Sequence, residues 1–267
     1  MKHVTFDDGR QMWALNAVDA AMLHQQIYRA QTYARPGWTL REGACVFDVG
    51  ANIGLCSRWL TEQHRGLRLF AFEPAPETFA ALERNAAEFT GAEVTLLRCA
   101  LGERRGEAML TFDRLASSMA SLREEGPAVD ARAWQSAVAA DLKLPRVAVA
   151  AVELARRVLR RRVPCEVRTL SDVIAEYGVE RIDLLKLDVE GVELQVLRGV
   201  SDADWARIEQ VVVETDDVPA VCALLERQGF AVDVTQDAGA TYRLLGLYNV
   251  FARRPPLPLL PRRRGSG

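Results

Sequence analysis

The strongest structural signal in the chain is the segment VFDVGANIGLCSRWL, which runs from Val46 to Leu60. It begins with apolar residues typical of a buried strand, places one acid at Asp48, turns through two glycines and continues in a helical pattern. A strand, a glycine turn and a helix in this order indicate a nucleotide-binding α/β unit. The acid is unexpected, because a charge at the end of an apolar strand needs a partner or a ligand.

From Cys45 onward, strand-like apolar runs alternate with helical patterns. The predicted strands are 45–49, 67–73, 93–99, 182–189, 210–215, 230–235 and 248–252. The predicted helices are 52–64, 76–89, 192–198 and 218–228. This alternation favours parallel strands joined by right-handed crossovers. The sequence therefore predicts an α/β fold with a doubly wound, mostly parallel, Rossmann-like sheet.

Three further segments flank or interrupt this main domain, 45–254. Residues 1–44 are predicted to form an N-terminal cap with a short strand-turn start and a helix over 18–33. Residues 126–164 are rich in alanine and arginine and are predicted to be an insert of one or two helices. The tail, 255–267, is rich in proline and arginine and is predicted to be disordered.

Composition excludes several classes of protein. The chain has 267 residues, and its net charge of -2 gives no electrostatic basis for binding nucleic acid. It has no run of about 18 apolar residues, so we expect no membrane-spanning segment, and its first residues lack the apolar core of a signal peptide. The cysteines are widely spaced and form no C-x-x-C pair, which favours reduced thiols in a cytoplasm over disulfides or zinc.

The glycine turn is the expected nucleotide site. Gly50 and Gly54 bracket the turn, and Gly50 allows the backbone to approach a ligand closely. We expect Asn52 to cap the following helix, whose first N–H groups attract anions. Glu73 ends the second strand at the position where a carboxylate receives ribose hydroxyls in such folds. A plain strand-helix loop and a solvated loop acid are the alternatives.

Asp48, the acid before the turn, limits the classes of ligand that the turn can bind. A nicotinamide cofactor requires G-x-G-x-x-G, whereas this turn reads G-A-N-I-G after Asp48. Because like charges repel, Asp48 is badly placed for a pyrophosphate. It suits a nucleoside with a positive amine, such as S-adenosylmethionine, which it could contact directly or through water.

A second group of charges lies in IDLLKLDVEGVELQVLRG, Ile182 to Gly199. With a period of two, Lys186, Asp188 and Glu190 share one face of a strand whose other face is apolar. Buried charges on such a strand require partners. They either form a structural Lys186–Asp188 ion pair or lie at the strand's carboxyl end facing the cofactor and acceptor.

A third acidic cluster, Glu214, Asp216 and Asp217, ends the next strand. In a parallel sheet it could lie beside Asp188 and Glu190. Several carboxylates could hold Mg²⁺ or Ca²⁺, or they could cap the helix that begins at Val218. We favour capping and polar contacts, and we assign no metal.

Five segments carry a likeness to a known family. They are VFDVGANIG, AFEPAPETFAALERNA, CALGERRGEAML, RTLSDVIAEYGVERIDLLKLDVEGVELQVLRG and YNVFARR. Together they resemble FkbM-type S-adenosylmethionine-dependent methyltransferases over about residues 20–125 and 165–254. The preceding segment LHQQIYRAQTYARPGWTLREG resembles members from polyketide and nonribosomal peptide biosynthesis.

The resemblance implies a class I methyltransferase fold, S-adenosylmethionine as cofactor and methyl transfer to a hydroxyl oxygen. It implies that the cofactor is bound by the following residues: Asp48, Gly50, Asn52, Gly54 and Glu73. It also implies that Ala100 and Leu101 border the adenine, and that Asp188 and Glu190 match the second family motif.

An alcohol becomes a good nucleophile only when its proton is removed, so a base is expected. We favour Asp188 as this base or as the acceptor anchor, with Glu190 second. Tyr33 either closes over the cofactor or packs within the cap. His24 is expected at the surface, unless the N-terminal helix forms a lid.

The sequence thus favours an O-methyltransferase that acts on a hydroxylated small molecule, a natural-product intermediate that is free or carrier-bound. A sugar O-methyltransferase, a non-catalytic binding module and an NAD-type oxidoreductase are the alternatives. Arginines concentrate at the end of the predicted helix Val147 to Arg162. They form a solvated face, a membrane-surface helix or a contact with an acidic partner such as a carrier protein.

Overall fold

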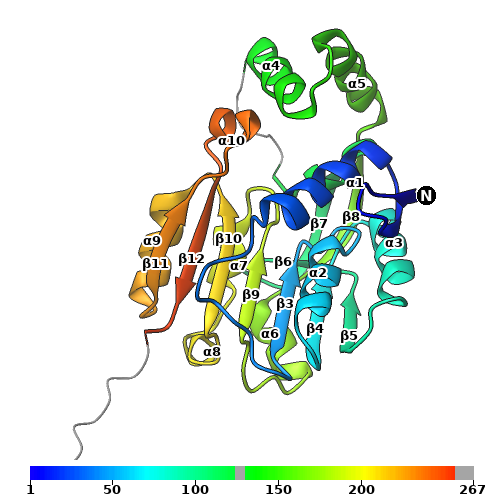
Figure 1. The fold of residues 1–267 in the computed structure, drawn as a ribbon. Helices are drawn as coiled ribbons and strands as arrows, with labels where there is room; N and C mark the ends of the chain where they lie inside the picture. The colour runs from blue at the N-terminus through cyan, green and yellow to red at the C-terminus, as the bar shows by residue number, and fades with distance from the viewer. Residues whose placement is uncertain (124–129, 256–267) are drawn as a thin grey trace, which may run out of the picture.

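The computed structural model describes residues 1–123 and 130–255, and its centre is a seven-stranded sheet (Figure 1). Five strands run parallel: β3 (Cys45–Val49), β4 (Leu67–Phe72), β5 (Ala92–Leu97), β9 (Leu184–Leu187) and β10 (Gln210–Thr215). The last two, β11 (Ala231–Thr235) and β12 (Tyr248–Arg253), are antiparallel to their neighbours. The strand order β11-β12-β10-β9-β3-β4-β5 confirms the predicted mostly parallel sheet.

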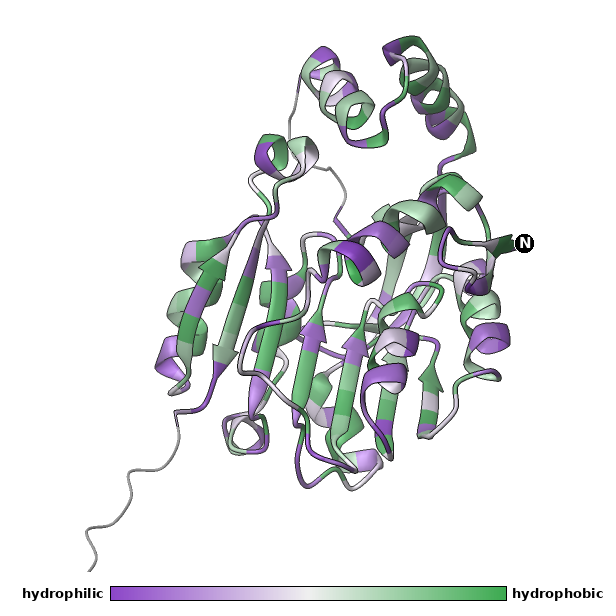
Figure 2. Ribbon diagram, viewed as in Figure 1, coloured by the Kyte–Doolittle hydropathy of each residue, from purple (hydrophilic) through white to green (hydrophobic). Residues whose placement is uncertain are grey.

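Helices cover both faces of this sheet, as a doubly wound fold requires. One face packs against α6 (Leu170–Glu176), α7 (Glu193–Arg198) and α9 (Val218–Arg227). The other face packs against α2 (Leu55–Gln63), α3 (Pro76–Ala86) and the N-terminal segment. A short helix, α8 (Asp202–Trp205), precedes β10. The strands between these layers are hydrophobic along most of their length, which explains why both faces are covered (Figure 2).

The N-terminal cap is a hairpin followed by a helix. The hairpin consists of β1 (Lys2–Thr5) and β2 (Gln11–Ala14), and the helix α1 (Ala17–His24) continues into a π-helix, η1 (Gln25–Ala30). The predicted single helix over 18–33 is therefore too long and too regular. The observed helical segment ends at Ala30 because Gln31 adopts a left-handed conformation, with φ 53°.

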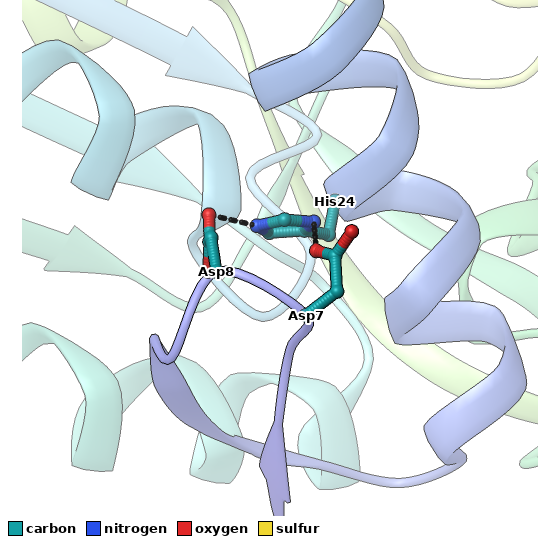
Figure 3. A group of neighbouring side chains, drawn as sticks. All are labelled: Asp7, Asp8 and His24. Atoms are coloured by element: carbon teal, nitrogen blue, oxygen red, sulfur yellow. Dashed lines mark hydrogen bonds and ion pairs between the residues drawn. The ribbon is translucent and has the colours of Figure 1, made fainter.

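His24 packs between the hairpin and the cap helix. Its burial corrects the prediction that His24 lies at the surface. Its side chain is buried and stacks between the rings of Phe6 and Tyr28. Figure 3 shows its ring held between two acids, with Nε2 2.8 Å from Asp8 and Nδ1 3.7 Å from Asp7. These three groups have the spacing of metal ligands, but they lie outside the cavities of the sheet edge.

The insert lies between two strands of a second, smaller sheet. That sheet contains β6 (Ala100–Leu101), β7 (Gly106–Phe112) and β8 (Arg161–Arg168). Between β7 and β8 the chain forms a 3-10 turn, η2 (Ser117–Met119), and then α4 (Ala131–Leu142) and α5 (Arg146–Leu159). Two helices are confirmed, but the predicted insert of 126–164 extends too far. Residues 161–164 belong to β8 because they pair with β7.

Both insert helices stand above the edge of the sheet where the parallel strands end (Figure 1). A last helix, α10 (Ala240–Leu245), lies beside α4. Asp141 of α4 joins them, because its carboxylate accepts hydrogen bonds from the backbone N–H groups of Ala240 and Thr241 at 2.7 and 2.8 Å. The insert is thereby fixed over the carboxyl ends of the strands.

Among the described residues, no helix is long and apolar enough to cross a membrane. All five cysteines are present as free thiols. The predicted disordered tail lies outside the described residues from position 256 onward, as does the start of the predicted insert, 126–129.

The glycines of the first turn are required by packing inside the protein. A Cβ on Gly50 would lie 1.8 Å from the backbone oxygen of Asp188, and φ at Gly50 is 78°. A Cβ on Gly54 would lie 2.7 Å from the side chain of Leu82 in α3. The structure therefore requires Gly50 for the close approach of two chain segments. Gly50 also lines the main cavity at the sheet edge, so its close approach to a ligand stays a prediction.

Replacing Gly50 with alanine should destabilise the protein more than replacing Gly91. Gly91 also has a positive φ, 74°, but a Cβ there meets nothing within 4 Å. We expect Gly91→Ala to cost about 1 kcal/mol through its left-handed backbone alone. Gly50→Ala should cost at least ~3 kcal/mol, because it adds a backbone clash. Urea unfolding of the cofactor-free protein measures both, and equal losses would refute the packing role of Gly50.

Candidate functional site

Two adjoining cavities lie at the carboxyl edge of the sheet. They sit beside the point where β3 has β4 on one side and β9 on the other, which is the switch point of the strand order. Asp188, Glu190 and Glu214 line both cavities. The first cavity also contains the glycine turn, and the second extends toward α5 of the insert.

Glu73 lies in the first cavity, where the sequence predicts it. It is 4% exposed, and its carboxylate accepts hydrogen bonds from the backbone N–H groups of Asn52 and Ala75 at 3.1 and 2.8 Å. These bonds fix the carboxylate against the glycine turn. Burial raises the pKa of Glu73 to about 7.

Asn52 does not cap α2, and this corrects the sequence expectation. Its side-chain oxygen accepts a hydrogen bond from the N–H of Ile53 at 2.7 Å, and its φ is 51°. Gly54 is the N-cap residue of α2 and gives it no side-chain cap, and the first helical residues, Leu55 and Cys56, line the first cavity. The unpaired N–H groups of a first helical turn favour an anionic group at this position. Gly54 itself does not line the cavity.

Asp48 lies beneath the cavity and does not line it. It is fully buried, 3.1 Å from the Lys186 ammonium, and it accepts a hydrogen bond from Ser57 Oγ at 2.7 Å. Its charge is thus balanced inside the protein, where we expected it to face a cationic ligand. Burial opposes the charge of Lys186, but Asp48 and Asp188 raise its pKa above the usual value, so the lysine stays protonated.

Asp188 joins the buried ion pair to the cavity. Its Oδ2 lies 3.6 Å from the Lys186 ammonium and accepts a hydrogen bond from the Tyr33 hydroxyl at 2.8 Å. The ammonium also lies 5.3 Å from the centre of the Tyr33 ring. Asp188 therefore forms the structural ion pair and also lines the cavity, and its position facing the cofactor and acceptor stays a prediction. Tyr33 lines the cavity as well.

Two further carboxylates lie next to Asp188. Glu190 has a positive φ of 58° and lines both cavities. Burial and the charge of Asp188 raise the pKa values of Glu190 and Glu214 well above their usual range. Glu214 accepts a hydrogen bond from the Tyr242 hydroxyl at 2.8 Å, and Gln26 of the π-helix donates to that same hydroxyl at 3.1 Å.

The remaining acids of the third cluster make the polar contacts that we favoured. Asp217 caps α9, because its side chain accepts a hydrogen bond from the N–H of Ala220. Asp216 forms an ion pair with Arg123, whose Nη1 lies 2.8 Å away. These contacts occupy both carboxylates within the protein.

The rest of the first cavity is largely apolar. Ala100 and Leu101 line it, as predicted for the adenine border, together with Cys99. Farther from the glycine turn, apolar side chains from α1, the insert and the residues around α10 form the lining: Met22, Leu115, Trp134, Val138, Leu142, Leu245 and Leu247. The cavity thus has a polar end at the glycine turn and, below the insert and α10, an outer compartment whose lining is mainly apolar.

Sequence reasoning missed several residues of the site. Tyr242 and Trp134 lie on helices that cover the cavity, and nothing in their local sequence marks them. Asp19 is buried and accepts hydrogen bonds from the hydroxyls of Ser117 and Ser118 across the cavity. The only signal for Asp19 in the sequence was its position as an acid among apolar residues of a predicted helix.

The residues of the first cavity fit S-adenosylmethionine. Glu73 can accept ribose hydroxyls, and the apolar pair Ala100 and Leu101 can border an adenine. The uncapped start of α2 can receive a carboxylate, while the acids near Asp188 favour a positive group. The cavity has no G-x-G-x-x-G turn for a dinucleotide.

The comparisons with known proteins agree with this geometry. The model of the Methyltransferase FkbM domain matches residues 48–232. The chain is 38% identical to 31-O-demethyl-FK506 methyltransferase FkbM of Streptomyces tacrolimicus, over 90% of this chain and 92% of that protein. It is 34% identical to methyltransferase sdnD of Sordaria araneosa, over 84% of this chain and 86% of that protein.

A third relative is much longer than this chain. The AMB antimetabolite synthetase AmbE of Pseudomonas aeruginosa is 32% identical over 94% of this chain, but the match covers only 12% of that synthetase. The family model and the two relatives of similar length decide the classification. The chain belongs to the FkbM family of S-adenosylmethionine-dependent methyltransferases.

Proposed function

We propose that the chain transfers a methyl group from S-adenosylmethionine to a hydroxyl oxygen of a small molecule, an intermediate of natural-product biosynthesis. The site's arrangement supports this, because the carboxylate of Asp188 lines the same cavity as the glycine turn and the apolar side chains of the insert. The name of the Streptomyces tacrolimicus relative, which is a 31-O-demethyl-FK506 methyltransferase, supports transfer to oxygen.

The observation that carries the proposal is the way in which Asp188 is held. Its two recorded side-chain contacts, with Tyr33 and Lys186, both involve Oδ2. Among the described residues Oδ1 has no recorded partner, although Asp188 lines both cavities. One oxygen therefore fixes the side chain, and the other is available to accept a proton from an acceptor hydroxyl.

S-adenosylmethionine, when bound, supplies a methyl group on a sulfonium, which is already a good leaving group. The protein must then hold the acceptor and remove its proton. Asp188 accepts that proton at Oδ1, while the Lys186 ammonium and the Tyr33 hydroxyl hold Oδ2. The cap and the insert exclude water from the site, because their side chains line the same cavity as Asp188.

The lining of the outer compartment favours an acceptor with an apolar body. Trp134, Val138 and Leu142 of the insert helix α4 line it, and α10 adds Leu245. A sugar is polar on most of its surface and would leave its hydroxyls without partners against this lining. We therefore propose a largely apolar acceptor. It is either free or carrier-bound, and the match to a small part of the synthetase AmbE supports the carrier-bound form.

A methylation screen tests the proposed function. We expect a gain of one methyl group, detected by mass spectrometry, on apolar alcohols from a panel of hydroxylated small molecules, free and attached to a carrier protein. Monosaccharides serve as the comparison, and they should react at least tenfold more slowly. The protein without S-adenosylmethionine is the control. Transfer to nitrogen or carbon acceptors alone would contradict the proposal.

The variant Asp188→Asn should lower kcat by at least about a hundredfold, because it keeps the shape but removes the base. The dissociation constant of S-adenosylmethionine should change by less than about threefold. Tyr33→Phe is the matched control: it removes the hydrogen bond to Oδ2 but leaves the carboxylate, so kcat should fall by only about tenfold. A collapse of cofactor binding in Asp188→Asn would make Asp188 a cofactor ligand.

Cofactor binding should weaken as the pH falls through about 7, the raised pKa of Glu73. Above this pH the carboxylate is charged and accepts ribose hydroxyls strongly, whereas below it the group is protonated and accepts them weakly. We expect the dissociation constant of S-adenosylmethionine to rise about three- to tenfold between pH 8 and pH 6. Glu73→Gln should bind more weakly at pH 8 and lose this pH dependence. Calorimetry at several pH values measures both, and an unchanged slope in the variant would remove Glu73 from the ribose site.

A further inference from the structure

Four arginines line the second cavity, and the protein neutralises two of them. Arg123 pairs with Asp216 at 2.8 Å, and Arg156 pairs with the buried Asp113 at 3.0 Å. The other two, Arg157 and Arg160, have no recorded carboxylate partner among the described residues. The arginines at the end of α5 therefore differ in their partners: Arg156 is paired, whereas Arg157 and Arg160 have no carboxylate partner among the described residues.

The two remaining arginines lie at the C-terminal end of α5. Arg157 belongs to the last turn of the helix, and Arg160, three residues later, is its C-cap residue. Glu153 precedes Arg157 by four residues and is placed to pair with it, but its carboxylate accepts a hydrogen bond from Gln135 at 2.9 Å. The helix dipole favours positive charge at this end, yet two adjacent guanidinium groups also repel each other. An anion that contacts both would remove this repulsion.

We propose that Arg157 and Arg160 form a subsite for a phosphate group carried by the methyl acceptor. This inference rests on the proposed function, and it adds a second recognition point to the hydroxyl at Asp188. Guanidinium groups bind phosphate through paired N–H donors, and two unpaired guanidinium charges match a phosphate dianion better than a single carboxylate. The same cavity contains both Asp188 and the arginines, so one acceptor can reach both.

The acids of this cavity do not prevent an anion from binding near α5. Asp216 is already paired with Arg123, and Asp188 is paired with Lys186. Burial and neighbouring carboxylates raise the pKa values of Glu190 and Glu214, which lowers their charge near neutral pH. Burial also raises the pKa of Glu193 to about 7. Glu153, the remaining acid of this cavity, accepts a hydrogen bond from Gln135 and has no cationic partner among the described residues, so it is the one acid that opposes a phosphate at α5.

Binding of simple amphiphiles tests the subsite without requiring methyl transfer. Octyl phosphate, octanoate and 1-octanol have apolar chains of seven or eight carbons that suit the outer compartment, and they differ mainly in the head group. In calorimetric titrations at low salt, octyl phosphate should bind at least about tenfold more tightly than 1-octanol, with octanoate between them. The advantage should shrink in high salt, because partly exposed charges are screened.

The double variant Arg157→Gln/Arg160→Gln should lose the phosphate advantage while its affinity for S-adenosylmethionine stays unchanged. The matched control is Arg132→Gln/Arg146→Gln, which removes two exposed arginines of the insert that line neither cavity. It should keep the advantage. Equal affinity for the three amphiphiles, an advantage that persists in the first variant, or equal losses in both variants would each overturn the inference.

A second titration identifies the source of the phosphate. The free phosphate ester of a hydroxylated acceptor and phosphopantetheine, the arm of a carrier protein, present the same group. Competition of each against octyl phosphate decides between them: the true source should displace octyl phosphate, and displacement should fail in the arginine double variant. If neither displaces it in the parent protein, the phosphate subsite is refuted. Because these titrations need no turnover, they can fail while the methylation screen succeeds, and the reverse also holds.

Discussion

The site depends on one buried ammonium group. Lys186 of β9 lies 3.1 Å from Asp48 of β3, donates a hydrogen bond to the backbone oxygen of Gly50 at 2.9 Å and lies 3.6 Å from Asp188. It therefore ties the two central strands to the glycine turn and to the acid that faces the cavity. Removing one partner of such a buried pair leaves an uncompensated charge, which costs about 3–5 kcal/mol. The same interaction explains why an acid occurs at the end of the first strand.

Two segments that are distant in the sequence, the N-terminal cap and the C-terminal part of the chain, lie over the cavity as two covers. The cap supplies Tyr33, which donates to Asp188, and the C-terminal part of the chain supplies Tyr242, which donates to Glu214. Each tyrosine thus fixes one carboxylate at the end of one strand. Gln26 of the π-helix contacts Tyr242, so the two covers also contact each other. The insert completes the enclosure from above the sheet edge (Figure 1).

Much of the fold could be predicted from the sequence because its signals are local. Hydrophobic strands alternate with helices. The hydrophobic period and the length of each run predict the bounds of most of these elements to within a few residues. The predictions failed where contacts between residues that are distant in the sequence determine the secondary structure. Residues 161–164 form a strand because β7 lies beside them, and β9 ends at Leu187 because the chain turns at Glu190 and Gly191, both with positive φ.

For the site, the sequence determined which residue types lie at the strand ends. Gly50, Glu73, Asp188 and Glu190 line the cavities because parallel strands bring their carboxyl ends to one edge. Only the tertiary structure decided what each group contacts. Asp48 contacts a lysine and does not line the cavity, and Asn52 contacts its own neighbour and does not cap the helix. Arg156 is paired whereas Arg157 has no carboxylate partner among the described residues, because burial and partners depend on segments that are distant in the chain.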